Sequence, residues 1–137
     1  MLNTKIKQTL IILFTWLVLS QASIAASADN LVSQIELIPA TPNILKFEQN
    51  VTVNFKYDTT ETAGVRIFAR PFSGNKLTPN YAACPSPLYP LGSGTGSCAF
   101  TINSGNTTVS RIRFQVWDAN LTKILFQTFV PVSYQFR

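Results

Sequence analysis

Alternation of apolar and polar side chains is the feature that most restricts how this chain can fold. It is clearest where Val51, Val53, Phe55 and Tyr57 alternate with polar residues. Side chains of a β-strand point to opposite faces in turn, so this pattern predicts a strand with one buried face. Beyond the first 28 residues, no segment has the 3.6-residue period of an amphipathic helix. The pattern therefore predicts an all-β protein.

The first 28 residues have the three parts of a secretory signal peptide. Two lysines within the first seven residues precede an apolar run over residues 10–19, and small residues follow this run. The run is about half the ~20 residues that a membrane-spanning helix needs, and no later segment is longer and equally apolar. We expect cleavage after Ala25 or Ala28. The mature chain, residues 29–137, is then expected to be secreted or periplasmic, with no transmembrane segment.

The charge and composition restrict the class of protein further. Cleavage removes Lys5 and Lys7, so the formal net charge of +5 becomes +3 after subtraction of these two cations. This excess is too small to indicate a nucleic-acid partner. Charged residues and aromatic residues each make up 12% of the chain, which is the opposite of a disordered composition. A mature chain of roughly 110 residues is long enough to bury one core.

Turn residues divide the mature chain into six or seven expected strands. The closing strand is expected to be interrupted at Pro131, and the proline-rich stretch 77–97 is expected to be irregular. Within that stretch the run Gly92–Gly96 is expected to be a flexible connector. This spacing predicts a single Greek-key β-sandwich of six to eight strands. The expected strands cover residues 33–38, 44–47, 50–58, 65–72, 98–103, 109–119 and 124–136.

The apolar faces of these strands define the expected core, because only one face of each strand is continuously apolar. The predicted core residues are Val51, Val53, Phe55, Ile67, Phe100, Ile102, Ile112, Phe114 and Val116.

Cys84 and Cys98 are expected to form a disulfide bond, because an exported chain meets an oxidising environment. For a loop of this length, the chain-entropy estimate of the stabilisation is about 3 kcal/mol. Two free thiols are the alternative, and a cysteine pair without histidine is a poor metal site. We expect the bond to hold the proline-rich stretch while the two main sheets fold largely independently of it.

The order of these segments resembles immunoglobulin-like and fibronectin type III-like modules over essentially the whole mature chain. The resemblance includes the run Arg111–Trp117 followed by a long closing strand. The segment Gly64–Phe72, with residues 77–81 and 86–90 after it, is also similar to a module of exported bacterial and archaeal proteins whose role is unassigned. These resemblances imply a β-sandwich and no activity. Cys84 lies too late in the chain to belong to the inter-sheet disulfide of antibody domains.

The absence of histidine excludes several catalytic classes. Ser-His-Asp and Cys-His hydrolases and histidine-based zinc sites all need this residue. Asp58 and Glu61 flank a turn, where we expect solvated acids rather than a glycosidase pair or a calcium site. The sequence thus predicts no catalytic residue, no metal and no cofactor. An enzyme with a carboxylate-only site is the remaining catalytic alternative.

One expected sheet face combines arginine with aromatic residues. The strand 65–72 and the strand 109–119 are neighbours in an immunoglobulin-like topology, and the closing strand lies beside the second. Period two places Arg111 and the candidate binding residues on the outer face, opposite the core. We predict that this face is exposed to solvent. The candidate binding residues are Arg66, Phe68, Arg70, Arg113, Gln115, Trp117 and Phe129.

This face supports one leading function and leaves two alternatives. Aromatic residues and arginine are enriched in interfaces, so the sequence predicts an exported, non-catalytic module that binds a protein partner or a carbohydrate. Alternatively, stacked guanidinium and aromatic groups only cover the sheet, each exposed pair contributing about 0.5–1 kcal/mol. The other function is a structural or assembly subunit of an envelope or extracellular complex. It would act by strand-edge pairing through the first or the last strand.

Overall fold

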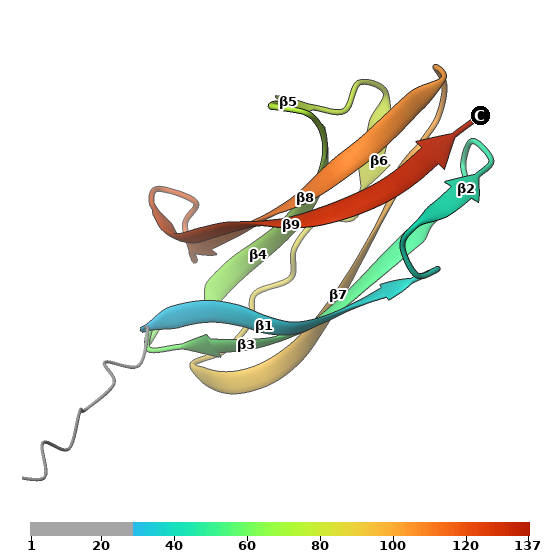
Figure 1. Ribbon diagram of the computed structural model, residues 1–137. Helices are drawn as coiled ribbons and strands as arrows, with labels where there is room; N and C mark the ends of the chain where they lie inside the picture. Colours follow the sequence, from blue (N-terminus) through green and yellow to red (C-terminus); the bar gives the residue numbers. More distant parts are fainter. Residues whose placement is uncertain (1–28) are drawn as a thin grey trace, which may run out of the picture.

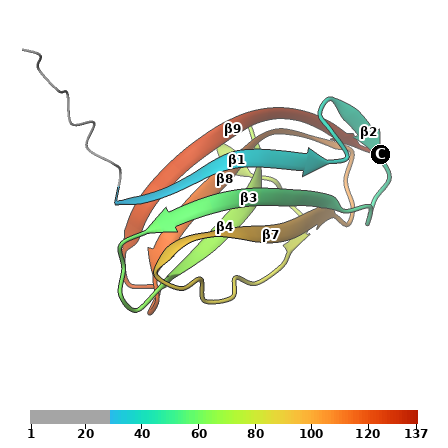
Figure 2. The ribbon, with the colours of Figure 1, turned by 90° about the horizontal axis from the view of Figure 1, so that it is seen from below.

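The computed structural model describes residues 29–137, so the predicted signal peptide and its cleavage sites lie outside the described residues. Nine strands form two sheets that pack face to face (Figures 1 and 2). Within this range no helix has the length and apolar character needed to cross a membrane. The strands are β1 (Asn30–Ile38), β2 (Asn43–Leu45), β3 (Val51–Thr59), β4 (Val65–Ser73), β5 (Lys76–Leu77), β6 (Tyr81–Ala83), β7 (Gly92–Ile102), β8 (Thr107–Asp118) and β9 (Ile124–Phe136).

The strand order is that of an immunoglobulin-like sandwich. One sheet has the order β1-β3-β7-β6, and the other has the order β2-β9-β8-β4-β5. Neighbouring strands are antiparallel except for β2, which runs parallel to β9. The sheet β1-β3-β7-β6 thus packs against a sheet whose three central strands are β9, β8 and β4, which is the strand order typical of this fold. The predicted all-β sandwich is confirmed, but the number of strands exceeds the predicted six to eight. The additional elements include β5 and β6, which have only two and three residues.

The closing strand has the bounds predicted from the sequence. It was expected to break at Pro131, but β9 continues through this residue. The register between β8 and β9 instead shifts between Val109 and Arg111, which pair with Tyr134 and Pro131. A bulge adds one residue to one strand and bends it without ending the ladder. The proline is therefore accommodated by a bulge rather than by a chain break.

The proline-rich stretch 77–97 is more ordered than the sequence predicted. Tyr89 and Val65 exchange two backbone hydrogen bonds, of 2.8 and 2.9 Å, along the outer edge of β4. The Ile67 N–H donates to Ser86 Oγ at 2.8 Å, and the Thr78 N–H donates to the Pro71 carbonyl at 2.9 Å. Along this edge, hydrogen bonds to backbone and side-chain groups of the proline-rich stretch take the place of a neighbouring strand. The stretch is thus hydrogen-bonded to β4, and the expectation that the sheets fold largely independently of it stays a prediction.

The glycine run forms the first half of β7 and is not a flexible connector. Gly94 and Gly96 lie opposite Tyr57 and Phe55 in the β3–β7 ladder. A Cβ atom on Gly94 would approach the Tyr57 ring to 2.7 Å, and one on Gly96 would approach the Phe55 ring to 2.5 Å. Because both distances are shorter than a van der Waals contact, only glycine leaves room for the two rings. Here the alternating glycines serve packing, not flexibility.

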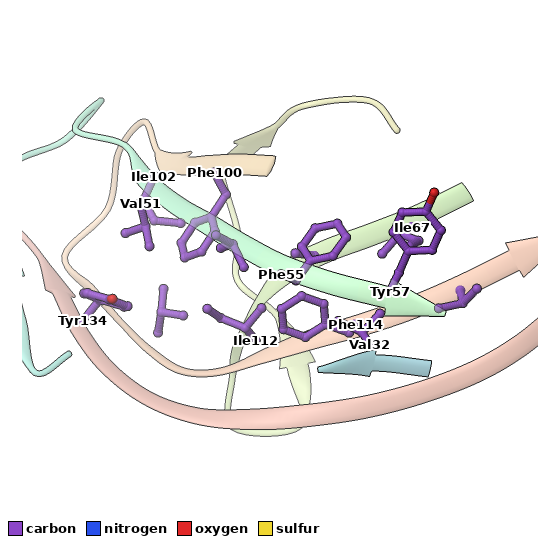
Figure 3. Packing of buried hydrophobic residues seen from close by; sticks show 14 of the residues in the cluster. Val32, Val51, Phe55, Tyr57, Ile67, Phe100, Ile102, Ile112, Phe114 and Tyr134 are labelled. Atoms are coloured by element: carbon purple, nitrogen blue, oxygen red, sulfur yellow. The ribbon is translucent and has the colours of Figure 1, made fainter. Parts of the chain in front are cut away.

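The core lies between the two sheets and contains all nine predicted residues, each at most 3% exposed. Figure 3 shows Phe55 and Phe114 approaching each other from opposite sheets, with their ring centroids 6.1 Å apart and the rings nearly perpendicular. Tyr89, from the proline-rich stretch, packs against Phe55 with a centroid distance of 5.9 Å. The predicted facing of β3, β4, β7 and β8 is therefore confirmed.

The predicted disulfide is present between Cys84 and Cys98, whose Cα atoms are 5.8 Å apart. Cys84 directly follows β6 and Cys98 lies on β7, so the bond links neighbouring strands of one sheet. As predicted, it is not the inter-sheet bond of antibody domains. The bond covalently links the end of the short edge strand β6 to the neighbouring strand β7.

Candidate functional site

The predicted arginine and aromatic residues share the outer face of the sheet β4-β8-β9. Across the β4–β8 ladder, Arg70 lies directly opposite Arg113 and Phe68 lies opposite Gln115. In the same ladder Arg66 lies opposite Trp117. Across the β8–β9 ladder, Arg113 pairs with Phe129. Period two along each strand therefore brings all seven candidate residues to one face, as expected.

This face is partly buried under its own side chains. The guanidinium carbon of Arg113 lies 4.9 Å from the centre of the Phe72 ring, and that of Arg111 lies 4.4 Å from the Phe129 ring. The Phe72 and Phe129 rings meet edge to face at 5.4 Å. As a result only 7% of Phe72 is exposed, although its position in β4 directs it outward. The prediction of a solvent-facing surface holds only for part of the sheet.

Gln115 was predicted to be an exposed binding residue, but it is only 7% exposed. Its amide is occupied on both sides: Oε1 accepts a hydrogen bond from Trp117 Nε1 at 3.2 Å, and Nε2 donates to Gln127 Oε1 at 2.7 Å. The neighbouring Trp117 and Gln127 cover it, which the position of one residue within its strand cannot reveal. Its side chain holds the indole of Trp117 in place.

The exposed part of this face is hollowed into a groove of about 260 Å³, which we call the arginine groove. Five of the seven candidate residues contribute to it, whereas Arg66 and Phe129 do not. Two further residues, Tyr81 and Leu121, were missed by the sequence analysis. The lining residues are Phe68, Arg70, Tyr81, Arg113, Gln115, Trp117 and Leu121.

Tyr81 reaches the arginine groove from the opposite sheet. It begins β6, which pairs with β7, yet its side chain lines the groove beside Arg70 and Arg113. Leu121 lies in the turn between β8 and β9 and is 48% exposed. The alternation of apolar and polar residues could not predict either position. Tyr81 belongs to the opposite sheet, and Leu121 lies in a turn, where side-chain direction has no period of two.

The other two candidate residues, Arg66 and Phe129, do not line the groove and contact other parts of the protein instead. Arg66 Nε donates to the Ala119 carbonyl at 3.1 Å, and Nη1 donates to the Ser86 carbonyl at 3.0 Å. Arg66 thereby joins β4 to the β8–β9 turn and to the proline-rich stretch. Phe129 lies beneath Arg111 and against Phe72. The structure thus divides the predicted residues into a groove and its support.

The arginine groove is positively charged without local compensation. None of its seven lining residues is acidic. Burial lowers the pKa of Arg70 and of Arg113, Tyr81 partly opposes this in both, and the positive charge of Arg70 lowers the pKa of Arg113 further. Both guanidinium groups nevertheless stay charged, because arginine does not lose its proton in proteins. Like charges directly opposite in a ladder are destabilising, so an anion placed between them would be stabilised.

Arg113 also carries a polar atom without a partner. Among the described residues, its Nε is the one buried side-chain nitrogen or oxygen that lacks a hydrogen bond. A buried donor left unsatisfied costs free energy, on the order of 1–3 kcal/mol. Arg70, by contrast, donates from Nη1 to the Ala69 carbonyl at 3.0 Å. Because Nε is closed to solvent, the capacity that Arg113 offers to a ligand is that of its terminal Nη groups, which donate no hydrogen bond to the described residues.

The acidic residues near strand ends bind neighbouring turn and strand residues and form no site; Asp58 lies near the end of β3 and Asp118 ends β8. Asp58 accepts a hydrogen bond from the hydroxyl of Ser93. Asp118 accepts from the backbone N–H groups of Thr122 and Lys123 at 2.7 and 2.8 Å. The hydrogen bond from the Thr122 side chain is the main cause that lowers the pKa of Asp118. Within residues 29–137, no cluster of three or more His, Cys, Asp or Glu residues is arranged to hold a metal ion.

Comparison with known proteins supports the fold. No protein-family model matches the chain. No curated protein matches it in sequence. Among solved structures, it is similar to a Niemann-Pick type C2 protein from Japanese carpenter ant, with a TM-score of 0.52 and 11% sequence identity. The match covers 82% of this chain and 96% of that chain. At this identity, the similarity shows a shared two-sheet, all-β fold, and the resemblance to exported bacterial and archaeal modules stays a prediction.

Proposed function

We propose that this protein is an exported, non-catalytic binding module that recognises a protein partner or a carbohydrate through the arginine groove. The observation that carries the proposal is the pair Arg70 and Arg113. The two cations lie directly opposite each other in a groove that Trp117 and Tyr81 also line and that has no acidic lining residue. Charge-assisted hydrogen bonds from such a pair would hold an anionic group of a ligand.

The four arginines of this face differ in how many hydrogen bonds their guanidinium groups donate to other residues of the protein. Arg111 donates to the Gly74 carbonyl from Nε and Nη2, at 3.1 and 2.6 Å, and to Asn75 Oδ1 at 2.9 Å. Arg66 is held by two backbone carbonyls. Sheet covering accounts for these two residues. It does not account for Arg113, whose guanidinium group donates no hydrogen bond to the described residues and lines the groove.

The disulfide supports an extracellular or periplasmic location. Such bonds persist in oxidising compartments and are rare in the cytosol. The Cys84–Cys98 bond is therefore consistent with the predicted signal peptide. Partners are accordingly to be sought outside the cytoplasm.

The test is capture from the culture medium and the envelope fraction of the source cells, together with a glycan array. Trp117→Ala and Arg70→Ala should each abolish specific capture without unfolding the protein. Arg111→Ala is the matched control, because Arg111 lies on the same face but outside the groove. Raising the salt concentration from about 0.05 to about 0.5 M should weaken capture severalfold, because the Debye length falls to roughly 4 Å.

Capture that survives both substitutions and the salt change would contradict the proposal. Sheet covering predicts the reverse pattern, in which Trp117→Ala lowers the melting temperature and leaves capture unchanged.

The second candidate function is assembly by strand pairing, and the edge of β9 favours it. The short β2 pairs only with Tyr134–Phe136 and the Ser133 N–H donates to Thr41 Oγ1, so within residues 29–137 no strand covers Ile124–Val132 on that side. Unpaired strand edges can accept a strand of another chain. If β9 mediates assembly, light scattering should detect oligomers, and Ile124→Lys should dissociate them. A monomer at all concentrations would exclude self-assembly through this edge.

A further inference from the structure

The arginine groove continues into a second depression on the same face. That depression has a volume of about 340 Å³ and shares Phe68 and Leu121 with the arginine groove. We call it the asparagine depression, after Asn120 in the β8–β9 turn. It is lined by Arg66, Phe68, Pro85, Ser86, Ala119, Asn120 and Leu121. Two joined hollows suit an extended ligand of at least two units better than a single small molecule.

The arginine groove offers mainly hydrogen-bond donors, and its one hydroxyl, that of Tyr81, already interacts with Arg70. Guanidinium groups are donors only. The amide of Gln115 is occupied on both sides, and the Trp117 N–H already donates to it. Hydroxyl groups of a neutral sugar need acceptors as well as donors. The unit that fits this groove is therefore an anion, rich in acceptor oxygens.

The asparagine depression has a different chemistry. Its arginine, Arg66, already donates to two backbone carbonyls. The Ser86 hydroxyl accepts from the Ile67 N–H and donates to the Pro87 carbonyl at 2.7 Å. The exposed amide of Asn120 supplies both a donor and an acceptor. This half of the surface suits an uncharged polar unit.

The surroundings of the two hollows disfavour a peptide as the ligand. Extended peptides commonly bind by adding a strand to a free sheet edge. The outer edge of β4, which borders both hollows, is occupied by Thr78, Ser86 and Tyr89. A ligand would therefore contact the residues that line the hollows, which include the Trp117 indole; the Arg70 guanidinium already lies over the Phe68 ring, 5.0 Å from its centre. A flat apolar face beside donors matches a sugar ring that carries a carboxylate.

From these observations, and resting on the proposed function, we infer that the ligand is a linear acidic oligosaccharide. Its uronate unit lies in the arginine groove, with the carboxylate between Arg70 and Arg113 and the sugar ring on Trp117. The adjoining unit lies in the asparagine depression and hydrogen-bonds with Asn120.

Isothermal titration with four uronate-containing tetrasaccharides tests this inference. The probes are fragments of hyaluronan, chondroitin, polygalacturonate and polymannuronate, each paired with its carboxyl-reduced form. At least one acidic probe should bind, and its reduced form should bind about tenfold or more weakly, because the charge-assisted hydrogen bonds are lost. Arg70→Gln and Arg113→Gln should each weaken the acidic probe to a similar degree. Arg111→Gln should leave its affinity unchanged within about twofold.

The length of the probe tests the second hollow separately. Asn120→Ala should weaken the tetrasaccharide severalfold and leave glucuronate, a single unit, unaffected. Thermal unfolding of every variant checks that the fold is retained.

Equal affinity for an acidic probe and its reduced form would overturn the inference, as would no binding of any probe. An oligoglutamate peptide, measured in parallel, distinguishes the two failures. If the peptide binds and Arg70→Gln abolishes its binding, the ligand is a protein partner and the proposed function stands. If neither sugars nor peptide bind, and capture from cell fractions is insensitive to Trp117→Ala, the proposed function fails as well.

Discussion

Gly96 lies directly opposite Phe55 in the β3–β7 ladder, and the space of its missing side chain is filled by the Phe55 ring. A Cβ atom there would lie 2.5 Å from two ring carbons of Phe55 and 2.7 Å from the Tyr89 hydroxyl oxygen. The same ring touches Phe114 of the other sheet. One glycine therefore determines how closely the sheets and the proline-rich stretch pack.

Gly96→Ala should lower the free energy of unfolding by about 1–3 kcal/mol, the usual cost of adding a methyl group to a filled core. Urea denaturation measures the effect. Thr95→Ala, at an exposed neighbouring position, is the control and should have little effect. A Gly96→Ala variant as stable as the parent would show that Phe55 can move away without cost.

Phe114→Ala should lower the free energy of unfolding by about 3–5 kcal/mol, because it leaves a cavity beside Phe55. Such a loss is enough to unfold a domain of marginal stability. Circular dichroism during thermal unfolding measures it, with the exposed Lys56→Ala on β3 as the control. An unchanged melting temperature would mean that the facing of β8 is off by one residue, and the arginine face with it.

The disulfide should support both stability and the wall of the arginine groove. Thiol titration of the native, unreduced protein should find no free cysteine, and two reactive thiols would contradict the bond. Replacing both cysteines by serine should lower stability by at most about 3 kcal/mol. Because Cys84 follows β6, this double variant should also loosen Tyr81 and weaken binding. Tyr81→Ala should weaken binding in the same way while keeping both cysteines bonded.

Stability should fall at alkaline pH. Burial raises the pKa of Tyr134 and of Tyr89, which disfavours their charged forms in the folded state. The neutral tyrosines therefore contribute their full stability below the unfolded pKa of about 10, and this contribution is lost as the pH rises through the higher folded values. Urea denaturation at about pH 8 and about pH 11 measures the loss. Tyr134→Phe should reduce it, and an identical pH dependence in that variant would contradict the assignment.

The period of two in the sequence was sufficient to predict the core and the outer face. Ile67 and Phe114 face inward, and Arg70 and Arg113 face outward, because strand geometry alone decides these directions. Tyr81 could not be found in this way, since its place in the groove depends on a crossing from the other sheet. The burial of Gln115 likewise depends on hydrogen bonds to residues of two strands.

The glycine run was misinterpreted although a signal was present. Glycine is conformationally permissive, which suggested a flexible connector. However, Gly94 and Gly96 are two residues apart, as are Tyr57 and Phe55 in β3, and small residues opposite large ones are typical of strands that pack aromatic rings. The register needed to align the two pairs is a long-range property that periodicity within one strand does not contain.

The closed outer edge of β4 has a consequence for the thermodynamics of binding. Thr78, Ser86 and Tyr89 hold one side of this strand and β8 holds the other, so the floor under Arg70 cannot shift to fit a ligand. Little conformational entropy of the backbone remains to be lost on association. Free and bound forms should therefore differ by no more than about 1 Å in the backbone of this sheet. Changes in affinity on substitution would then report lost contacts rather than altered order.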